Sequence, residues 1–111
     1  MEKVNENDKE YRAGDSGPKY LFRGPKIEWG VIRFKPNQTL GAHFHNEVEE
    51  TFYFVSGTPQ MIINGKSYRV KVGDAFRISH KEIHDIINDT EKPIKIIFIK
   101  VPYLPDDKIT V

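Results

Sequence analysis

The sequence predicts an all-β fold, a small antiparallel β-barrel, and three observations support it. Short runs rich in β-branched and aromatic residues recur from residue 18 onward, and turn residues separate them. No long segment keeps a helical hydrophobic period. Asn64-Gly65 lies between two of the runs and is a strong hairpin signal, because both residues tolerate positive φ. Strands at such short, regular spacing are typical of β-sandwiches and barrels.

The expected strands follow one another in chain order, and turn residues end most of them. Those of the first half occupy 20–22, 28–35, 42–45 and 51–56. Those of the second half occupy 60–63, 66–72, 75–78, 84–88 and 94–101. The last ten residues carry two prolines, and proline cannot donate to a central ladder. We therefore expect this tail to pack along the outside of the barrel or across a partner subunit.

The chain length suits one domain. Residues 1–17 are polar and charged and are expected to form a flexible N-terminal tail, with residues 18–111 as the single barrel domain.

Lysine and arginine number 17 against 16 acidic residues, so no electrostatic footprint indicates a nucleic-acid partner. No apolar run is long enough for a membrane span, and the N-terminus has no apolar signal region, so we expect a cytoplasmic protein.

His43 and His45 predict a metal site. Residues two apart on a strand point to the same face, so both imidazoles can reach one ion. On the following strand Glu50, Phe52 and Phe54 share a face, which we assign to the interior because it is the more apolar one. This parity selects Glu50 as the inward carboxylate and leaves Glu49 as the alternative if the strand slips by one residue.

His84 is the fourth predicted ligand. Cysteine is absent, so nitrogen and oxygen donors must hold the ion. One divalent transition metal (manganese, iron, cobalt, nickel, zinc or copper) fits such a set, and an octahedral ion keeps positions open for water or substrate. The imidazoles must be deprotonated to bind, so metal affinity should fall below about pH 6.5.

These residues resemble the two motifs of the cupin superfamily. The first motif has two histidines around one residue, then a glutamate and a glycine, which here are His43, His45, Glu50 and Gly57. The second begins at Gly73 and ends with His84 and Asn88, with Ser79 and Lys81 in place of the usual proline and glycine. The resemblance implies a double-stranded β-helix of jelly-roll type, a metal in its mouth, and a homodimer.

Other polar residues favour plainer interpretations. His80 and Glu47 are expected at the rim or surface, although a proton-shuttle role for His80 and a mouth role for Glu47 remain alternatives. Arg77 is expected to point outward, and an inward Arg77 would instead offer a fork for a substrate anion. Asn88 is interpreted as a turn cap. The lysines of 92–100 are interpreted as a solvated strand face.

Three functions fit these features. The first is a metal-dependent enzyme of dioxygenase, isomerase or decarboxylase type acting on a small polar metabolite. The second is a non-catalytic module that binds a sugar or other metabolite and holds a structural metal. The third is a structural protein whose metal only holds the barrel together. The sequence leaves the ion, the substrate and the presence of catalysis open, because the same donors serve several metals and a fold does not decide chemistry.

Overall fold

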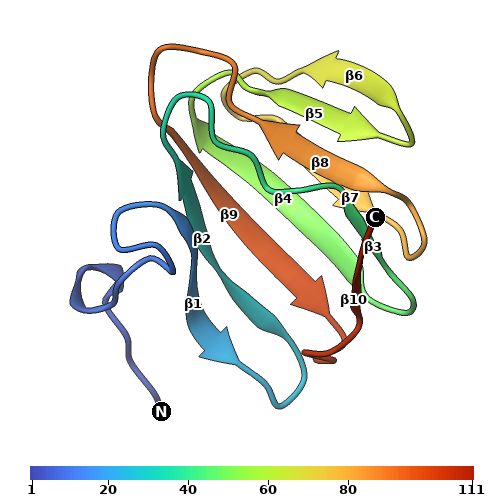
Figure 1. The fold of residues 1–111 in the computed structure, drawn as a ribbon. Helices are drawn as coiled ribbons and strands as arrows, with labels where there is room; N and C mark the ends of the chain where they lie inside the picture. Colours follow the sequence, from blue (N-terminus) through green and yellow to red (C-terminus); the bar gives the residue numbers. More distant parts are fainter.

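A computed structural model describes residues 1–111 and contains two five-stranded antiparallel sheets (Figure 1). The first sheet has the order β1 (Gly17–Arg23), β2 (Glu28–Phe34), β9 (Ile94–Val101), β4 (Glu49–Ser56) and β7 (Ala75–Ile78). The second has the order β10 (Lys108–Thr110), β3 (His43–His45), β8 (His84–Ile87), β5 (Gln60–Ile63) and β6 (Lys66–Arg69). The one helical element is the 3₁₀ turn η1 (Glu6–Asp8). No helix is both long enough and apolar enough to span a membrane.

The predicted all-β jelly roll is confirmed, and the prediction of a closed barrel is corrected. No ladder joins one sheet to the other, so β1, β7, β10 and β6 all remain edge strands. A barrel needs continuous hydrogen bonding around its circumference. Here the two sheets instead face each other and are held together by side chains between them, as in a sandwich.

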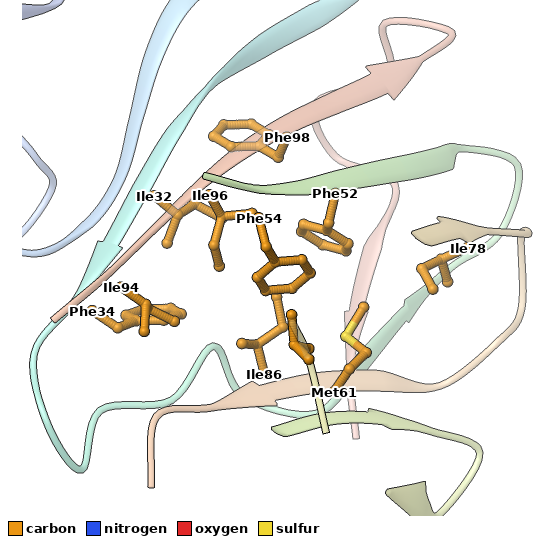
Figure 2. Packing of buried hydrophobic residues seen from close by; sticks show 11 residues of the cluster. Ile32, Phe34, Phe52, Phe54, Met61, Ile78, Ile86, Ile94, Ile96 and Phe98 are labelled. Atoms are coloured by element: carbon orange, nitrogen blue, oxygen red, sulfur yellow. The ribbon is translucent and has the colours of Figure 1, made fainter. Parts of the chain in front are cut away.

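Strand alternation decides which side chains form the core. On β4 Phe52 and Phe54 are fully buried, whereas Tyr53 and Val55 are exposed, as the parity argument predicted. On β9 Ile94, Ile96 and Phe98 repeat the pattern. Residues from both sheets meet between the layers (Figure 2). The core is therefore the apolar face of each sheet turned toward the other.

The Asn64-Gly65 turn joins β5 to β6, as predicted. Both residues have positive φ, 49° at Asn64 and 82° at Gly65. Ile63 and Lys66 are paired directly across this turn. The left-handed conformation of two successive residues matches the twist of the flanking strands and sets the hairpin register.

The C-terminal tail becomes an edge strand of the second sheet, which the sequence did not predict. β10 pairs antiparallel with β3, and Lys108 lies opposite His45. Asp107 Oδ2 accepts hydrogen bonds from the backbone N–H groups of Glu47 and Val48, at 2.8 and 2.9 Å. The tail thereby holds the loop that joins the two strands of the first motif.

Candidate metal centre

Three strands bring the four predicted ligands together. His43 and His45 lie on β3, Glu50 on β4 and His84 on β8, with His43 and His84 paired in register. All four side chains are buried, and their candidate ligand atoms lie within 4.8 Å of one another. The two sheets therefore contribute donors to one point, the histidines from one layer and the carboxylate from the other.

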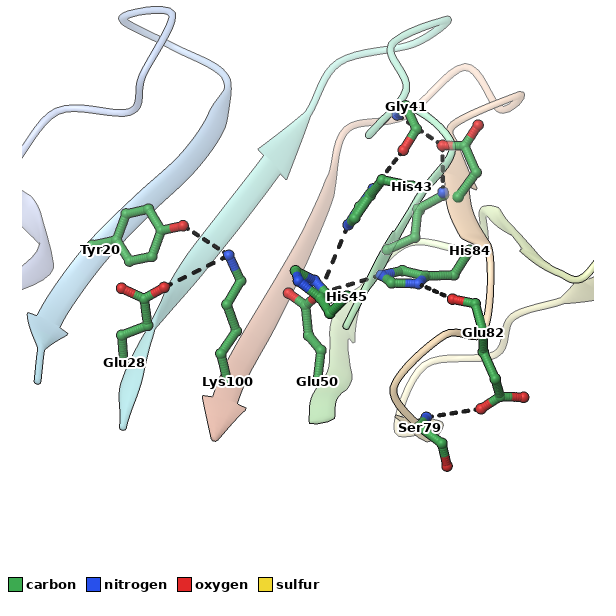
Figure 3. Close-up of polar contacts among 12 residues, drawn as sticks. Tyr20, Glu28, Gly41, His43, His45, Glu50, Ser79, Glu82, His84 and Lys100 are labelled. Atoms are coloured by element: carbon green, nitrogen blue, oxygen red, sulfur yellow. Dashed lines mark hydrogen bonds and ion pairs between the residues drawn. The ribbon is translucent and has the colours of Figure 1, made fainter. Parts of the chain in front are cut away.

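All three imidazoles direct Nε2 toward one carboxylate oxygen (Figure 3). Glu50 Oε1 lies 3.1 Å from His45 Nε2, 3.3 Å from His84 Nε2 and 3.9 Å from His43 Nε2. The ring of Phe52 packs beside His84, with centroids 5.8 Å apart. On this side the cluster therefore packs against the apolar core.

Backbone carbonyl groups orient two of the rings. His43 Nδ1 lies 2.7 Å from the carbonyl oxygen of Gly41, and His84 Nδ1 lies 3.0 Å from that of Glu82. A carbonyl oxygen only accepts, so each Nδ1 carries the proton in this network, and a neutral ring then leaves the Nε2 lone pair free. This tautomer is the one a metal ligand needs.

The charges of the cluster are compatible with a bound cation. Burial by itself would raise the pKa of Glu50, but its contacts with the three imidazoles outweigh burial and hold that pKa well below its ordinary value. Burial lowers the pKa of His43, against the opposing effect of Glu50, so this ring is neutral at pH 7. Its Nε2 lone pair then faces an ionised carboxylate, and two acceptors cannot satisfy each other.

A divalent ion fits these residues. It would accept the free Nε2 lone pairs and offset the buried negative charge of Glu50 at once. His45 Nδ1 is buried without a hydrogen-bond partner, so the tautomer of this third ring is not set by a neighbour. The donor set of three nitrogens and one oxygen suits borderline ions and does not discriminate among them.

The other polar candidates lie outside the cluster. His80 and Glu47 are exposed, and Glu49 faces the outer side of β4, opposite Val101 on β9. Arg77 is exposed on the outer face of β7. Asn88 caps a turn, as predicted, since its Oδ1 accepts from the backbone N–H of Thr90 at 3.1 Å.

The turn before His84 contains a left-handed residue, although the expected proline and glycine are absent. Lys81 takes the left-handed conformation, with φ 67°, and its N–H donates to the carbonyl oxygen of His45 at 2.6 Å. The backbone N–H of Ser79 donates to Glu82 Oε1 at 2.8 Å. The hydrogen bond that Glu82 Oε1 accepts and the left-handed Lys81 therefore define the turn in this chain.

A cavity of about 250 Å³ borders the ligands and is lined by His43, His45 and Glu50. Sequence reasoning missed most of its other polar residues. Lys100 was assigned to a solvated face, but its side chain is only 15 % exposed and its Nζ donates to Tyr20 Oη at 2.9 Å. The signal was present in the sequence, because Lys100 has the same parity on β9 as the buried Ile96 and Phe98.

Lys108 and Arg12 also line this cavity, from the two ends of the chain. Displacement of water by neighbouring atoms lowers the pKa of Lys108, and the positive charges of Lys100 and Arg12 lower it further. The three cations are therefore close enough to repel one another. No local pattern in the sequence places these segments together.

The comparisons with known proteins agree with the fold. A family model described as a cupin domain matches residues 30–100. A double-stranded β-helix protein from Klebsiella pneumoniae is 17% identical, with a TM-score of 0.84, and the match covers 100% of this chain and 97% of that one. The polyketide cyclase RemF from Streptomyces resistomycificus is 17% identical over 100% of this chain and 85% of that one, with a TM-score of 0.85. KdgF from Halomonas sp. is 17% identical, with 96% and 97% coverage and a TM-score of 0.78.

Proposed function

This chain belongs to the cupin family, and from that premise we propose that it is a metal-dependent enzyme acting on a small polar metabolite. His43, His45, Glu50 and His84 would hold one divalent transition metal. The observation that carries the proposal is the convergence of three Nε2 atoms on one buried carboxylate oxygen at the wall of a cavity. When bound, the ion supplies Lewis-acid polarisation of a substrate oxygen.

The cavity favours a reactive site over a purely structural metal. A metal that only fastens the two sheets would have its remaining positions blocked by protein atoms. Three of the four ligand side chains instead line an open space of about 250 Å³. A small molecule can therefore approach the donors from that side.

A pair of proton-carrying groups in the same wall favours catalysis over simple binding. Lys100 Nζ donates to Tyr20 Oη at 2.9 Å and lies 3.8 Å from Glu28 Oε1. Within the proposed enzyme, Tyr20 Oη is the group that we assign to proton transfer with the substrate. RemF, which has a similar fold, is described as a polyketide cyclase, and the proposal takes from it only that an enzyme can have this fold.

Metal analysis with a matched pair of variants tests the metal site. Glu50→Gln and His45→Ala should lower the metal content of protein purified without added metal, and Glu49→Gln should leave it unchanged because Glu49 faces outward. Addition of metal should raise the melting temperature of the wild type and of Glu49→Gln alone, since an ion bound only to the native state stabilises it. Unchanged metal content in both ligand variants would refute the site.

An activity screen then separates the enzyme from the non-catalytic binding module. Protein reconstituted with each ion in turn is expected to convert members of a panel of small keto acids, sugars and phenols with at least one metal. Tyr20→Phe should reduce that turnover while leaving metal content intact. Metal binding without turnover of any compound would favour the non-catalytic binding module.

We also propose a homodimer that uses the outer face of the first sheet. Tyr53, Val55, Ile99 and Val101 are 38–44% exposed on neighbouring strands of this face. These exposed apolar side chains are the contacts that we assign to the partner subunit. Light scattering should give twice the mass of 12.9 kDa, and Ile99→Lys should return the monomer.

The division of the chain at residue 17 is likewise a proposal. β1 begins at Gly17, and no residue before it belongs to either sheet, although Glu6 pairs with Lys95 at 2.6 Å. Limited proteolysis should remove residues 1–17 and leave residues 18–111 folded as the single domain. Cleavage first within residues 18–111 would contradict this division.

A further inference from the structure

A row of charged side chains crosses the first sheet at the cavity wall. Lys100 on β9 lies opposite Glu28 on β2 and opposite Glu50 on β4, and all three point to the interior (Figure 3). Neighbouring strands lie about 4.8 Å apart, so the ammonium group of Lys100 borders the space beside Glu50. A ligand that approaches the metal donors therefore meets a cation at the same time.

The cavity has an excess of positive charge. Glu28 is paired with Arg23 at 2.8 Å, and a divalent ion would offset the charge of Glu50. Lys108 and Arg12 line the cavity as well, and neither side chain has a hydrogen bond or an ion pair. Lys100, which donates to Tyr20 Oη and lies 3.8 Å from Glu28 Oε1, is the third cation of this wall.

The wall changes from charged to apolar along β2. Glu28 begins the strand, and the next inward side chains are those of Ile32 and Phe34, which also line the cavity. Leu40 adds to this apolar end. The cavity volume of about 250 Å³ suits a small molecule.

We propose that the cavity binds a small molecule that has an anionic oxygen group, a carboxylate or phosphate, and an apolar body. Arg12, Lys100 and Lys108 hold the anionic group, and Ile32 and Phe34 contact the body. The inference rests on the proposed function for the role of the metal. The cations belong to the protein itself, so anion binding is measurable without metal.

Titration of metal-free and zinc-loaded protein with three probes tests the proposal. Benzoate and its uncharged analogue benzamide have the same body and differ in charge, and inorganic phosphate has the charge without the body. Benzoate should bind at least about tenfold more tightly than benzamide, and added salt should weaken only the anions. Tighter binding of benzoate than of phosphate identifies the carboxylate as the preferred group, and the reverse order identifies phosphate.

Variants that each remove one positive charge identify the residues that hold the anion. Lys108→Gln and Arg12→Gln should each weaken benzoate binding about tenfold and leave benzamide binding unchanged. Lys71→Gln, an exposed lysine outside the cavity, is the control and should have no effect. Equal binding of benzoate and benzamide, or unchanged binding in both variants, would overturn the inference. Metal content is measured on the same samples, so loss of the metal site with retained anion binding would refute the proposed function alone.

Discussion

Replacing Lys81 with glycine should stabilise the protein. Lys81 has φ 67°, in the left-handed region, where a residue with a Cβ pays about 1–2 kcal/mol. Glycine avoids that cost but loses about 0.5–1 kcal/mol more conformational entropy on folding. The net gain in the free energy of unfolding is therefore about 0.5–1 kcal/mol, or a rise in melting temperature of about 2–4 °C.

The side chain of Lys81 is exposed and the contact that matters belongs to its backbone. Its N–H donates to the carbonyl oxygen of His45, and glycine retains this donor. Lys81→Ala is the matched control, because alanine also removes the lysine side chain but keeps the Cβ. Urea and thermal unfolding of the three proteins should place Lys81→Gly above the wild type and Lys81→Ala at or below it.

Metal content should be equal in all three proteins, because the turn geometry before His84 does not change. A Lys81→Gly protein no more stable than the wild type would refute the strain argument. So would an alanine variant as stable as the glycine variant, since the gain would then come from loss of the lysine side chain.

Three further changes have defined outcomes. Gly57→Ala should lower the free energy of unfolding, measured with urea, by about 3 kcal/mol or more, because Gly57 has φ 89° and a Cβ there would overlap Ile94. Gly65→Ala should lower it by only about 1 kcal/mol, because a Cβ at Gly65 meets open space. Asp107→Ala should cost about 1–2 kcal/mol in the same assay, since two backbone N–H groups lose their acceptor. Metal-free protein should lose stability as pH falls below about 6.5, because the pKa of His43 is lowered on folding and the unfolded chain then binds the proton more readily.

A specific result would contradict each of these three predictions. Similar losses in the two glycine variants would mean that backbone conformation alone matters at Gly57. An Asp107→Ala protein with wild-type stability would mean that the C-terminal tail does not hold the loop. For the pH series, His43→Gln should flatten part of the slope below about pH 6.5, and an unchanged slope would contradict the argument.

Local patterns in the sequence were enough to predict the strands from β1 to β9 and the four candidate ligands, but not β10. Side chains alternate with a period of two on any strand, whichever strand lies beside it. The choice of Glu50 over Glu49 and the shared face of His43 and His45 followed from that alone. The same alternation predicts that Lys100 faces the interior. The general expectation that lysine faces solvent led to the wrong assignment.

Long-range pairing decided the rest. β10 joins β3, which brings Lys108 opposite His45, and no local feature encodes that partnership. The cations of the cavity come from the segment before β1, from β9 and from β10, so only the folded chain gathers them. Whether the two sheets close into a barrel also depends on whether their edge strands lie close enough to hydrogen-bond. The sequence by itself determined which way each side chain faces along its own strand, and the tertiary structure decided which strands became neighbours, because pairing free energy arises between segments and not within them.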